Sequence, residues 1–151
     1  MEGNYVFRAN ARWTGARNGT VEAASQAPPV DFSAPPEFQG EAGKWTPEHF
    51  LLAAAAACFI TTFRAIAELS KFSAEALEVA AEGRMGKAEN GIRFTQIVLR
   101  PLLTIRNPAD RERALRLLEK AERSCLVSRS LRSEVRMEPD VRSAAAEASA
   151  A

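Results

Sequence analysis

The sequence predicts an α+β fold in which strands precede and follow one long central helix. Residues 5–12 alternate in character with a period of two, which is typical of a strand. The stretch from Glu48 to about Ser70 contains no glycine or proline and is long and apolar, which indicates a buried helix. Residues 92–105 are rich in β-branched and aromatic side chains and predict a further strand. The 151 residues fit one domain, which we expect over 1–142, with a disordered tail over 143–151.

The first third of the chain predicts a hairpin followed by a loop. Asn18-Gly19, after Arg17, favours a tight turn, because both residues tolerate positive φ. The returning strand is expected over 20–25. Residues 28–43 carry four prolines and two glycines, so this segment is predicted to be a loop with at most one short strand.

The long helix has a clear predicted start at Thr46-Pro47-Glu48. The Thr46 hydroxyl can accept hydrogen bonds from free backbone N–H groups, and Pro47 suits the first helical position. The charge of Glu48 complements the positive end of the helix dipole. The helix should therefore begin here and run to about Ser70.

The second half of the chain predicts further strands and a second helix. Alternating apolar residues over 77–81 indicate a strand, a turn follows around 86–91, and Pro101 places the next strand at an edge or beside a bulge. Asn107-Pro108 repeats the capped helix start, and Leu115, Leu117, Leu118 and Ala121 define the apolar face of that helix. Cys125 falls at its end. A short last strand is expected at residues 135–137.

Composition narrows the function classes. The net charge is +1, with 46% apolar and 26% charged residues, so neither nucleic acid nor an anionic membrane is an expected partner. The arginines of the second helix alternate with acidic residues, as on a solvated helix surface. The sequence start has neither a basic region nor an apolar run, so no signal peptide is expected. The apolar stretch from Phe50 to Ile60 is too short to span a bilayer, and we expect a cytoplasmic protein.

The chain contains two cysteines, Cys58 and Cys125. In a reducing compartment such a pair is either two unrelated core residues or a redox couple, and composition alone favours the core interpretation. Together with the single His49 they offer at most three soft metal ligands, without the close spacing of metal sites. No metal is expected.

The surroundings of the cysteines change this interpretation. Residues 45–59 read WTPEHFLLAAAAACF, which resembles the signature of the OsmC/Ohr family of hydroperoxide-reducing proteins. Residues 121–131 read AERSCLVSRSL, similar to the family's second segment, commonly Cys-Pro-Val-Ser followed by leucine. Residues 14–19 read TGARNG and resemble the hairpin that carries the family's arginine. The three segments occur in family order and frame about residues 5–138.

The resemblance implies an OsmC-like fold, with antiparallel sheets packed around the long helix in an intertwined homodimer. It also implies a cytoplasmic thiol-dependent peroxidase that reduces organic hydroperoxides in a stress response. Cys58 would attack the peroxide, Cys125 would resolve the sulfenic acid as a disulfide, Arg17 would favour the thiolate, and Glu48 would hold Arg17. No bound cofactor is implied. The reductant would be an external dithiol, such as dihydrolipoamide or a lipoylated protein.

Helix geometry adds an expectation about assembly. Glu48 and Cys58 are ten residues apart, so on one straight helix they lie roughly 15 Å apart along the axis and point about 80° apart around it. Two antiparallel helices that cross near Ala53 would set Glu48 of one chain level with Cys58 of the other. The small side chains of residues 53–57 permit such a crossing, and we predict a two-fold dimer with shared sites. Alternatively, the alanines merely favour helix, and Glu48 serves only its own helix end.

One departure and two rival functions remain open. Leu126 stands where the family commonly has proline, which puts the approach of Cys125 to Cys58 in question. The chain could instead be a non-enzymatic redox sensor on the same fold. It could also be a structural or ligand-binding dimer with inert cysteines.

Overall fold

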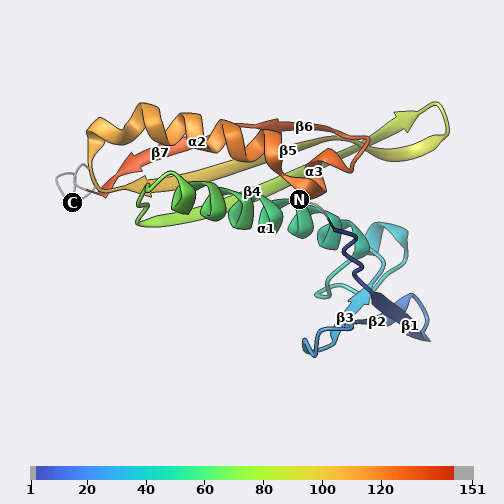
Figure 1. Ribbon diagram of the computed structural model, residues 1–151. Helices are drawn as coiled ribbons and strands as arrows, with labels where there is room; N and C mark the ends of the chain where they lie inside the picture. Colours follow the sequence, from blue (N-terminus) through green and yellow to red (C-terminus); the bar gives the residue numbers. More distant parts are fainter. Residues whose placement is uncertain (1–2, 145–151) are drawn as a thin grey trace. The chain divides into compact units, whose positions relative to one another are not determined.

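The computed structural model describes residues 3–144 and confirms an α+β architecture (Figure 1). The chain forms two compact units, one ending at Leu51 and the other beginning at Leu52. The predicted tail falls almost wholly outside the described residues, and the single-domain boundary at residue 142 stays a prediction.

The first unit contains a three-stranded antiparallel sheet in the order β1-β2-β3. Its elements are β1 (Ala9–Gly15), β2 (Asn18–Ala23), β3 (Val30–Ser33) and the short 3-10 helix η1 (Pro36–Phe38). The hairpin and the single short strand in the proline-rich segment are confirmed. The first strand begins at Ala9, later than the alternation from Tyr5 predicts.

The turn between β1 and β2 is shifted by one to two residues from the prediction. Positive φ falls on Gly15 (136°) and Ala16 (46°), not on Asn18 or Gly19. Asn18 is already the first residue of β2. Gly19 is required for a different reason: a Cβ there would lie 2.4 Å from the Phe32 ring, so only glycine lets β3 approach.

The long helix α1 spans Pro47–Leu69, as predicted. Its start is capped by Thr46, whose Oγ1 accepts a hydrogen bond from the His49 backbone N–H at 3.1 Å. The His49 ring Nδ1 lies 2.8 Å from the same hydroxyl. The exposed His49 therefore belongs to the helix cap.

The second unit contains a larger sheet centred on β5. The long strands β4 (Ala76–Ala88) and β5 (Gly91–Ile105) form an antiparallel hairpin with a bulge at Arg84/Met85. On the other side of β5, β6 (Glu134–Met137) and β7 (Asp140–Ser143) both pair with it in parallel. The expectation of purely antiparallel sheets is therefore wrong for these two pairs, and β7 was not predicted.

Pro101 lies in the interior of β5, fully buried opposite Val79, so its predicted place at an edge or bulge is wrong. β6 pairs with residues up to Leu99, and β7 pairs with residues from Leu102 onward. Arg100 and Pro101 fall between the two partners. A residue without an N–H therefore costs the sheet no hydrogen bond on that side.

The segment between β5 and β6 carries the second helix. The turn η2 (Pro108–Asp110) leads into α2 (Arg111–Ser124), and Asn107 Oδ1 accepts from the Ala109 backbone N–H at 3.0 Å. Cys125 directly follows α2 and precedes the short helix α3 (Leu126–Arg129). The predicted capped start and the position of Cys125 are both confirmed.

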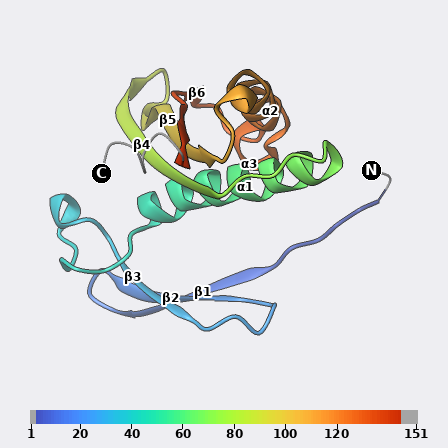
Figure 2. The same cartoon turned by 90° about the vertical axis from the view of Figure 1, so that its left-hand side faces the viewer.

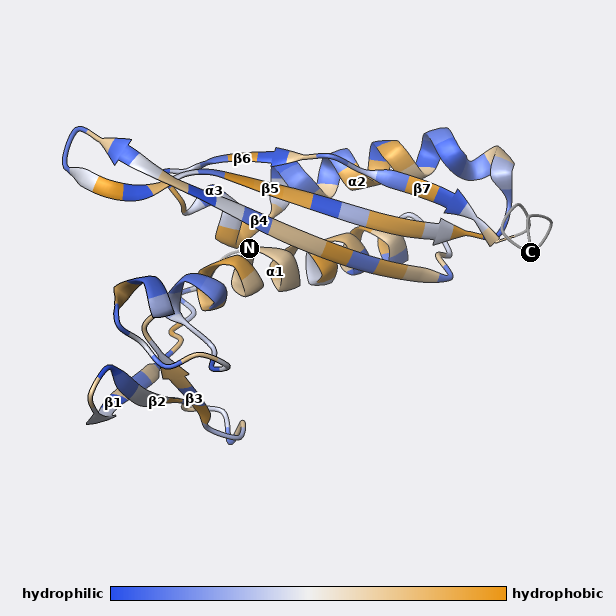
Figure 3. Cartoon of the chain, turned by 180° about the vertical axis from the view of Figure 1, so that it is seen from behind, coloured by the Kyte–Doolittle hydropathy of each residue, from blue (hydrophilic) through white to orange (hydrophobic). Residues whose placement is uncertain are grey.

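The core of the second unit lies between its helices and one face of its sheet. Figures 2 and 3 show α1 and α2 on the same side of this sheet. Side chains with at most 9% exposure meet there from α1, β5 and α2: Ala55, Phe59, Phe63, Ile66, Ala67, Ile97, Leu99, Leu103, Ile105, Ala114, Leu117, Leu118 and Ala121. The predicted apolar face of α2 is confirmed for Leu117, Leu118 and Ala121, whereas Leu115 is only partly buried.

With 23 residues, α1 is long and apolar enough to cross a membrane by length and composition. The expectation that the apolar stretch is too short to span a bilayer considered only Phe50 to Ile60 and underestimated the length of the helix. One such helix is weak support for a membrane span, because the central helix of a soluble protein passes the same test. Phe59 and Phe63 of α1 are fully buried in the core of the second unit, which explains its apolar character.

Candidate functional site

The structure brings the two cysteines together in the second unit. Cys58 lies in the middle of α1 and is half-buried, whereas Cys125 is fully buried between α2 and α3. Both are free thiols, and the Cys125 side chain is near enough to help lower the pKa of Cys58. Residues 67 positions apart in sequence are therefore neighbours in the fold.

The surroundings of Cys58 favour its thiolate. Burial raises the pKa of Cys58, but hydrogen bonds outweigh it and leave the pKa lowered. In decreasing order these come from the Val127 backbone, the Cys125 side chain, the Thr62 side chain and the Leu126 backbone. Thr62 Oγ1 lies 3.9 Å from the Cys58 sulfur. A lower pKa favours the thiolate form of Cys58, and the thiolate is the nucleophilic form of a cysteine.

Leu126 has a role that proline could not have. It is the first residue of α3, and its backbone contributes to the lowered pKa of Cys58. Proline has no backbone N–H to donate. The Leu126 backbone thus favours the Cys58 thiolate, and proline at this position is expected to lose that contribution.

The other two predicted residues, Arg17 and Glu48, belong to the first unit. Arg17 is exposed in the β1–β2 turn, and its carbonyl accepts from the Ala34 N–H at 3.1 Å. Among residues 3–144 its guanidinium makes no hydrogen bond or ion pair. Glu48 lies in the first turn of α1, and its Oε2 is buried without a hydrogen-bond partner within the described chain. Within residues 3–144, the first unit thus contains a guanidinium and one carboxylate oxygen that lack a hydrogen-bond partner.

Sequence reasoning missed three contributors to the lowered pKa of Cys58, and one buried acceptor in the first unit. Thr62 was detectable, since it follows Cys58 by four residues on a helix and must lie on the same face. The backbone groups of Leu126 and Val127 carry no side-chain signal. Asn18 was assigned only to a turn, yet its Oδ1 is a buried acceptor without a partner in the described residues.

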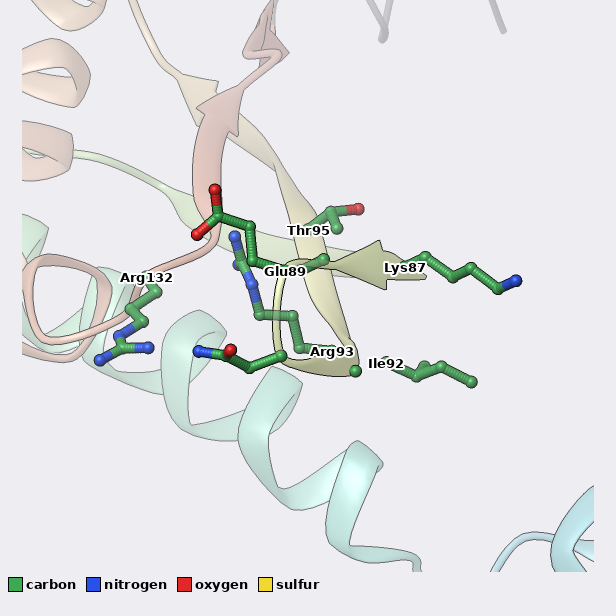
Figure 4. A pocket seen from close by; sticks show the side chains of 9 residues that line it. Lys87, Glu89, Ile92, Arg93, Thr95 and Arg132 are labelled. Atoms are coloured by element: carbon green, nitrogen blue, oxygen red, sulfur yellow. The ribbon is translucent and has the colours of Figure 1, made fainter.

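A cavity of about 420 Å³ lies at the end of the β4–β5 hairpin and contains none of the four predicted residues. Figure 4 shows Arg132 and Arg93 on one side of the hairpin and Lys87 and Ile92 directed away from Arg132. Its lining is mainly polar and charged. No group of three or more His, Cys, Asp or Glu side chains within 3–144 is arranged to hold a metal ion.

Comparison with known proteins gives consistent matches. The family described as OsmC-like protein matches residues 40–140. The uncharacterized protein YmaD of Bacillus subtilis (strain 168) is 31% identical over 140 residues, which cover 89% of this chain and 92% of YmaD.

Two solved structures share the fold over nearly their whole length. The organic hydroperoxide resistance protein OsmC of Legionella pneumophila is 30% identical, with a TM-score of 0.73 over 93% of this chain and 99% of that one. An organic hydroperoxide resistance protein of Elizabethkingia anophelis is 25% identical, with a TM-score of 0.75 over 95% of this chain and 99% of that one. Because the family matches residues 40–140 and YmaD matches over most of both chains, this chain belongs to the OsmC-like protein family.

Proposed function

We propose that this protein is a thiol-dependent peroxidase that reduces organic hydroperoxides to alcohols. The observation that carries the proposal is the cysteine pair: a half-buried Cys58 whose pKa is lowered in part by the neighbouring, buried Cys125 side chain. Similarity to the organic hydroperoxide resistance proteins of Legionella pneumophila and Elizabethkingia anophelis supports the substrate class.

In the first step the Cys58 thiolate attacks the terminal oxygen of the hydroperoxide. The O–O bond breaks, Cys58 becomes a sulfenic acid, and the leaving alkoxide takes up a proton to form the alcohol. The hydrogen bonds to Cys58 lower its pKa and so favour the thiolate. Arg17 would add a positive charge beside the sulfur, and Glu48 would fix the orientation of Arg17.

In the second step the Cys125 sulfur attacks the sulfur of the Cys58 sulfenic acid. The S–S bond forms, and the hydroxyl group leaves as water with the Cys125 proton. An external dithiol, such as dihydrolipoamide or a lipoylated protein, then reduces the disulfide by exchange and is itself oxidised. This chemistry requires a reducing compartment, so we place the protein in the cytoplasm, which cell fractionation tests.

We propose further that two copies form a dimer. In the single chain, large apolar side chains are exposed, including Phe7 (92%), Trp13 (77%) and Leu69 (87%). Burial of such side chains between two copies would remove this apolar surface from water. Glu48 and Cys58 lie on one uninterrupted helix, α1. Their spacing on this helix supports the proposal that the two residues of one chain serve two different active sites.

Turnover tests the peroxidase proposal. We expect reduction of cumene hydroperoxide with dihydrolipoamide, faster than that of hydrogen peroxide, and no activity in Cys58→Ser. Mass spectrometry after one equivalent of peroxide should detect a Cys58–Cys125 disulfide. A disulfide without turnover would identify a redox sensor instead, and inert cysteines would identify a structural or ligand-binding protein.

Mixed dimers test the shared site. Cys58→Ser and Glu48→Gln chains with different tags are co-expressed, and the mixed dimer is purified over both tags. If Glu48 serves the other chain's Cys58, the mixed dimer regains one complete site and about half of the wild-type activity. An inactive mixed dimer would place Glu48 and Cys58 of one site in the same chain, and a monomer in sedimentation analysis would remove the dimer altogether.

A further inference from the structure

The first unit contains two buried side-chain oxygens that lack a donor. Asn18 Oδ1 and Glu48 Oε2 are each inaccessible to solvent and have no hydrogen-bond partner within residues 3–144. A buried acceptor without a partner costs free energy, so native proteins rarely leave one unpaired without a functional reason. Two such acceptors in the same unit indicate that a group with several donors belongs beside them.

The orientation of Asn18 is fixed by its neighbours. Its Nδ2 donates to Glu41 Oε2 at 3.0 Å, and the same oxygen lies 3.2 Å from Lys44 Nζ. The Glu41 backbone N–H donates to the buried Ser33 Oγ at 2.8 Å, which holds this residue in place. A flipped Asn18 amide would point its oxygen at the Glu41 carboxylate, so the network assigns Oδ1 as the open acceptor.

Backbone contacts bring the relevant segments to one end of the first sheet. The Arg17 carbonyl is bonded to Ala34, directly after β3, and the Ser33 N–H donates to the Trp45 carbonyl at 2.9 Å. The Phe32 ring meets the Phe50 ring edge to face at 6.3 Å between centroids. The turn with Arg17, the start of β2 and the first turn of α1 therefore converge. Arg17 is the cation at this end whose side chain has no partner in the described residues.

We infer that Asn18 is a positioning residue for Arg17: its Oδ1 and Glu48 Oε2 together accept hydrogen bonds from the Arg17 guanidinium. A guanidinium has five donors in a rigid plane, which suits two acceptors in fixed positions. The inference rests on the proposed function, since it gives Arg17 its place beside the reacting sulfur and peroxide. The Lys44–Glu41 pair then acts through Asn18 to orient the cation.

A double-mutant cycle tests whether Asn18 acts through Arg17. Asn18→Ala should lower kcat/KM for cumene hydroperoxide about tenfold, the effect of losing one hydrogen bond to a charged group. In an Arg17→Met background the same change should have no further effect, because the guanidinium is already gone. The pH profile of Cys58 alkylation should move to higher pH in Asn18→Ala and in Arg17→Met, without addition in the double variant.

A rescue variant separates positioning from general structure. Asn18→Asp combined with Glu41→Gln exchanges donor and acceptor between the two residues, so their hydrogen bond and one free oxygen at position 18 are kept. This double variant should restore most of the activity lost in Asn18→Ala. Equal losses from Asn18→Ala with and without Arg17, or failure of the rescue in a folded protein, would overturn the inference.

The two proposals fail in different ways. If the wild-type protein has no peroxidase turnover, the proposed function fails, while the alkylation profile still reports whether Asn18 acts through Arg17. If turnover is present but the Asn18 and Arg17 effects add independently, the proposed function stands and the positioning role of Asn18 fails.

Discussion

Replacing Leu126 by proline isolates one backbone hydrogen bond to the reactive sulfur. Leu126 is the first residue of α3, where the fixed φ of proline fits and its missing N–H breaks no helical hydrogen bond. The Leu126 side chain is 63% exposed, so its loss removes little packing. The change should therefore remove the donor to Cys58 and leave the fold intact.

The expected size follows from the order of the contributions. A hydrogen bond to a charged group contributes about 1.5 to 3 kcal/mol. The Leu126 contribution is the smallest of the four hydrogen bonds to Cys58, and the half-exposed sulfur is screened by water. We therefore expect an effect at or below the lower end of this range. The pKa of Cys58 should rise, and below its pKa the thiolate fraction should fall.

The assay is the rate of Cys58 alkylation by iodoacetamide as a function of pH. Peptide mass spectrometry separates the half-buried Cys58 from the buried Cys125. Leu126→Ala is the matched control, because it removes the side chain and keeps the N–H. An unchanged or lower pKa in Leu126→Pro, or an equal shift in Leu126→Ala, would refute the assignment of this N–H as a donor.

Three further variants test packing, capping and charge. Phe63→Ala should lower the free energy of unfolding by about 3 to 5 kcal/mol, measured by urea denaturation, because the ring is fully buried; a loss below about 1 kcal/mol would contradict its core position. Asn107→Ala should cost about 1 kcal/mol in the same assay by removing the acceptor for the Ala109 N–H, and Asn107→Asp should retain stability. Burial raises the pKa of Glu122 in the folded protein. Ionisation of Glu122 therefore opposes folding, and the free energy of unfolding falls as the pH rises from the unfolded pKa through the folded pKa. Glu122→Gln should therefore be slightly more stable at neutral pH, by under about 1 kcal/mol because the group is only partly buried, and thermal melts at acidic pH should show the difference disappear.

Local signals in the sequence predicted the elements that local chemistry determines. The start of α1 followed from Thr46 and Pro47, because capping depends on residues within one turn. The edge position of Pro101 was wrong for the opposite reason. A proline is excluded from a central strand only if its N–H is needed, and whether β6 and β7 leave a gap there depends on segments more than thirty residues away.

The candidate site likewise has residues that the sequence could indicate and residues that only the structure could show. The resemblance to a family suggested the pairing of Cys58 with Cys125, which no spacing rule connects. It could not show that Leu126 supplies a donor, since its side chain takes no part. Asn18 could not be predicted as a site residue from the sequence. An unpaired buried oxygen is recognised only when every hydrogen bond around it has been assigned.

The parallel pairing of β5 with β6 makes the segment between Ile105 and Glu134 a crossover connection, and Cys125 lies within it. The β4–β5 hairpin can form from neighbouring residues, whereas the crossover must first close a long loop at an entropic cost. Cys58 precedes this connection in the chain, whereas Cys125 lies between two strands that pair only when the loop has closed. Changes in crossover length should affect the folding rate and the timing with which the second thiol reaches the first.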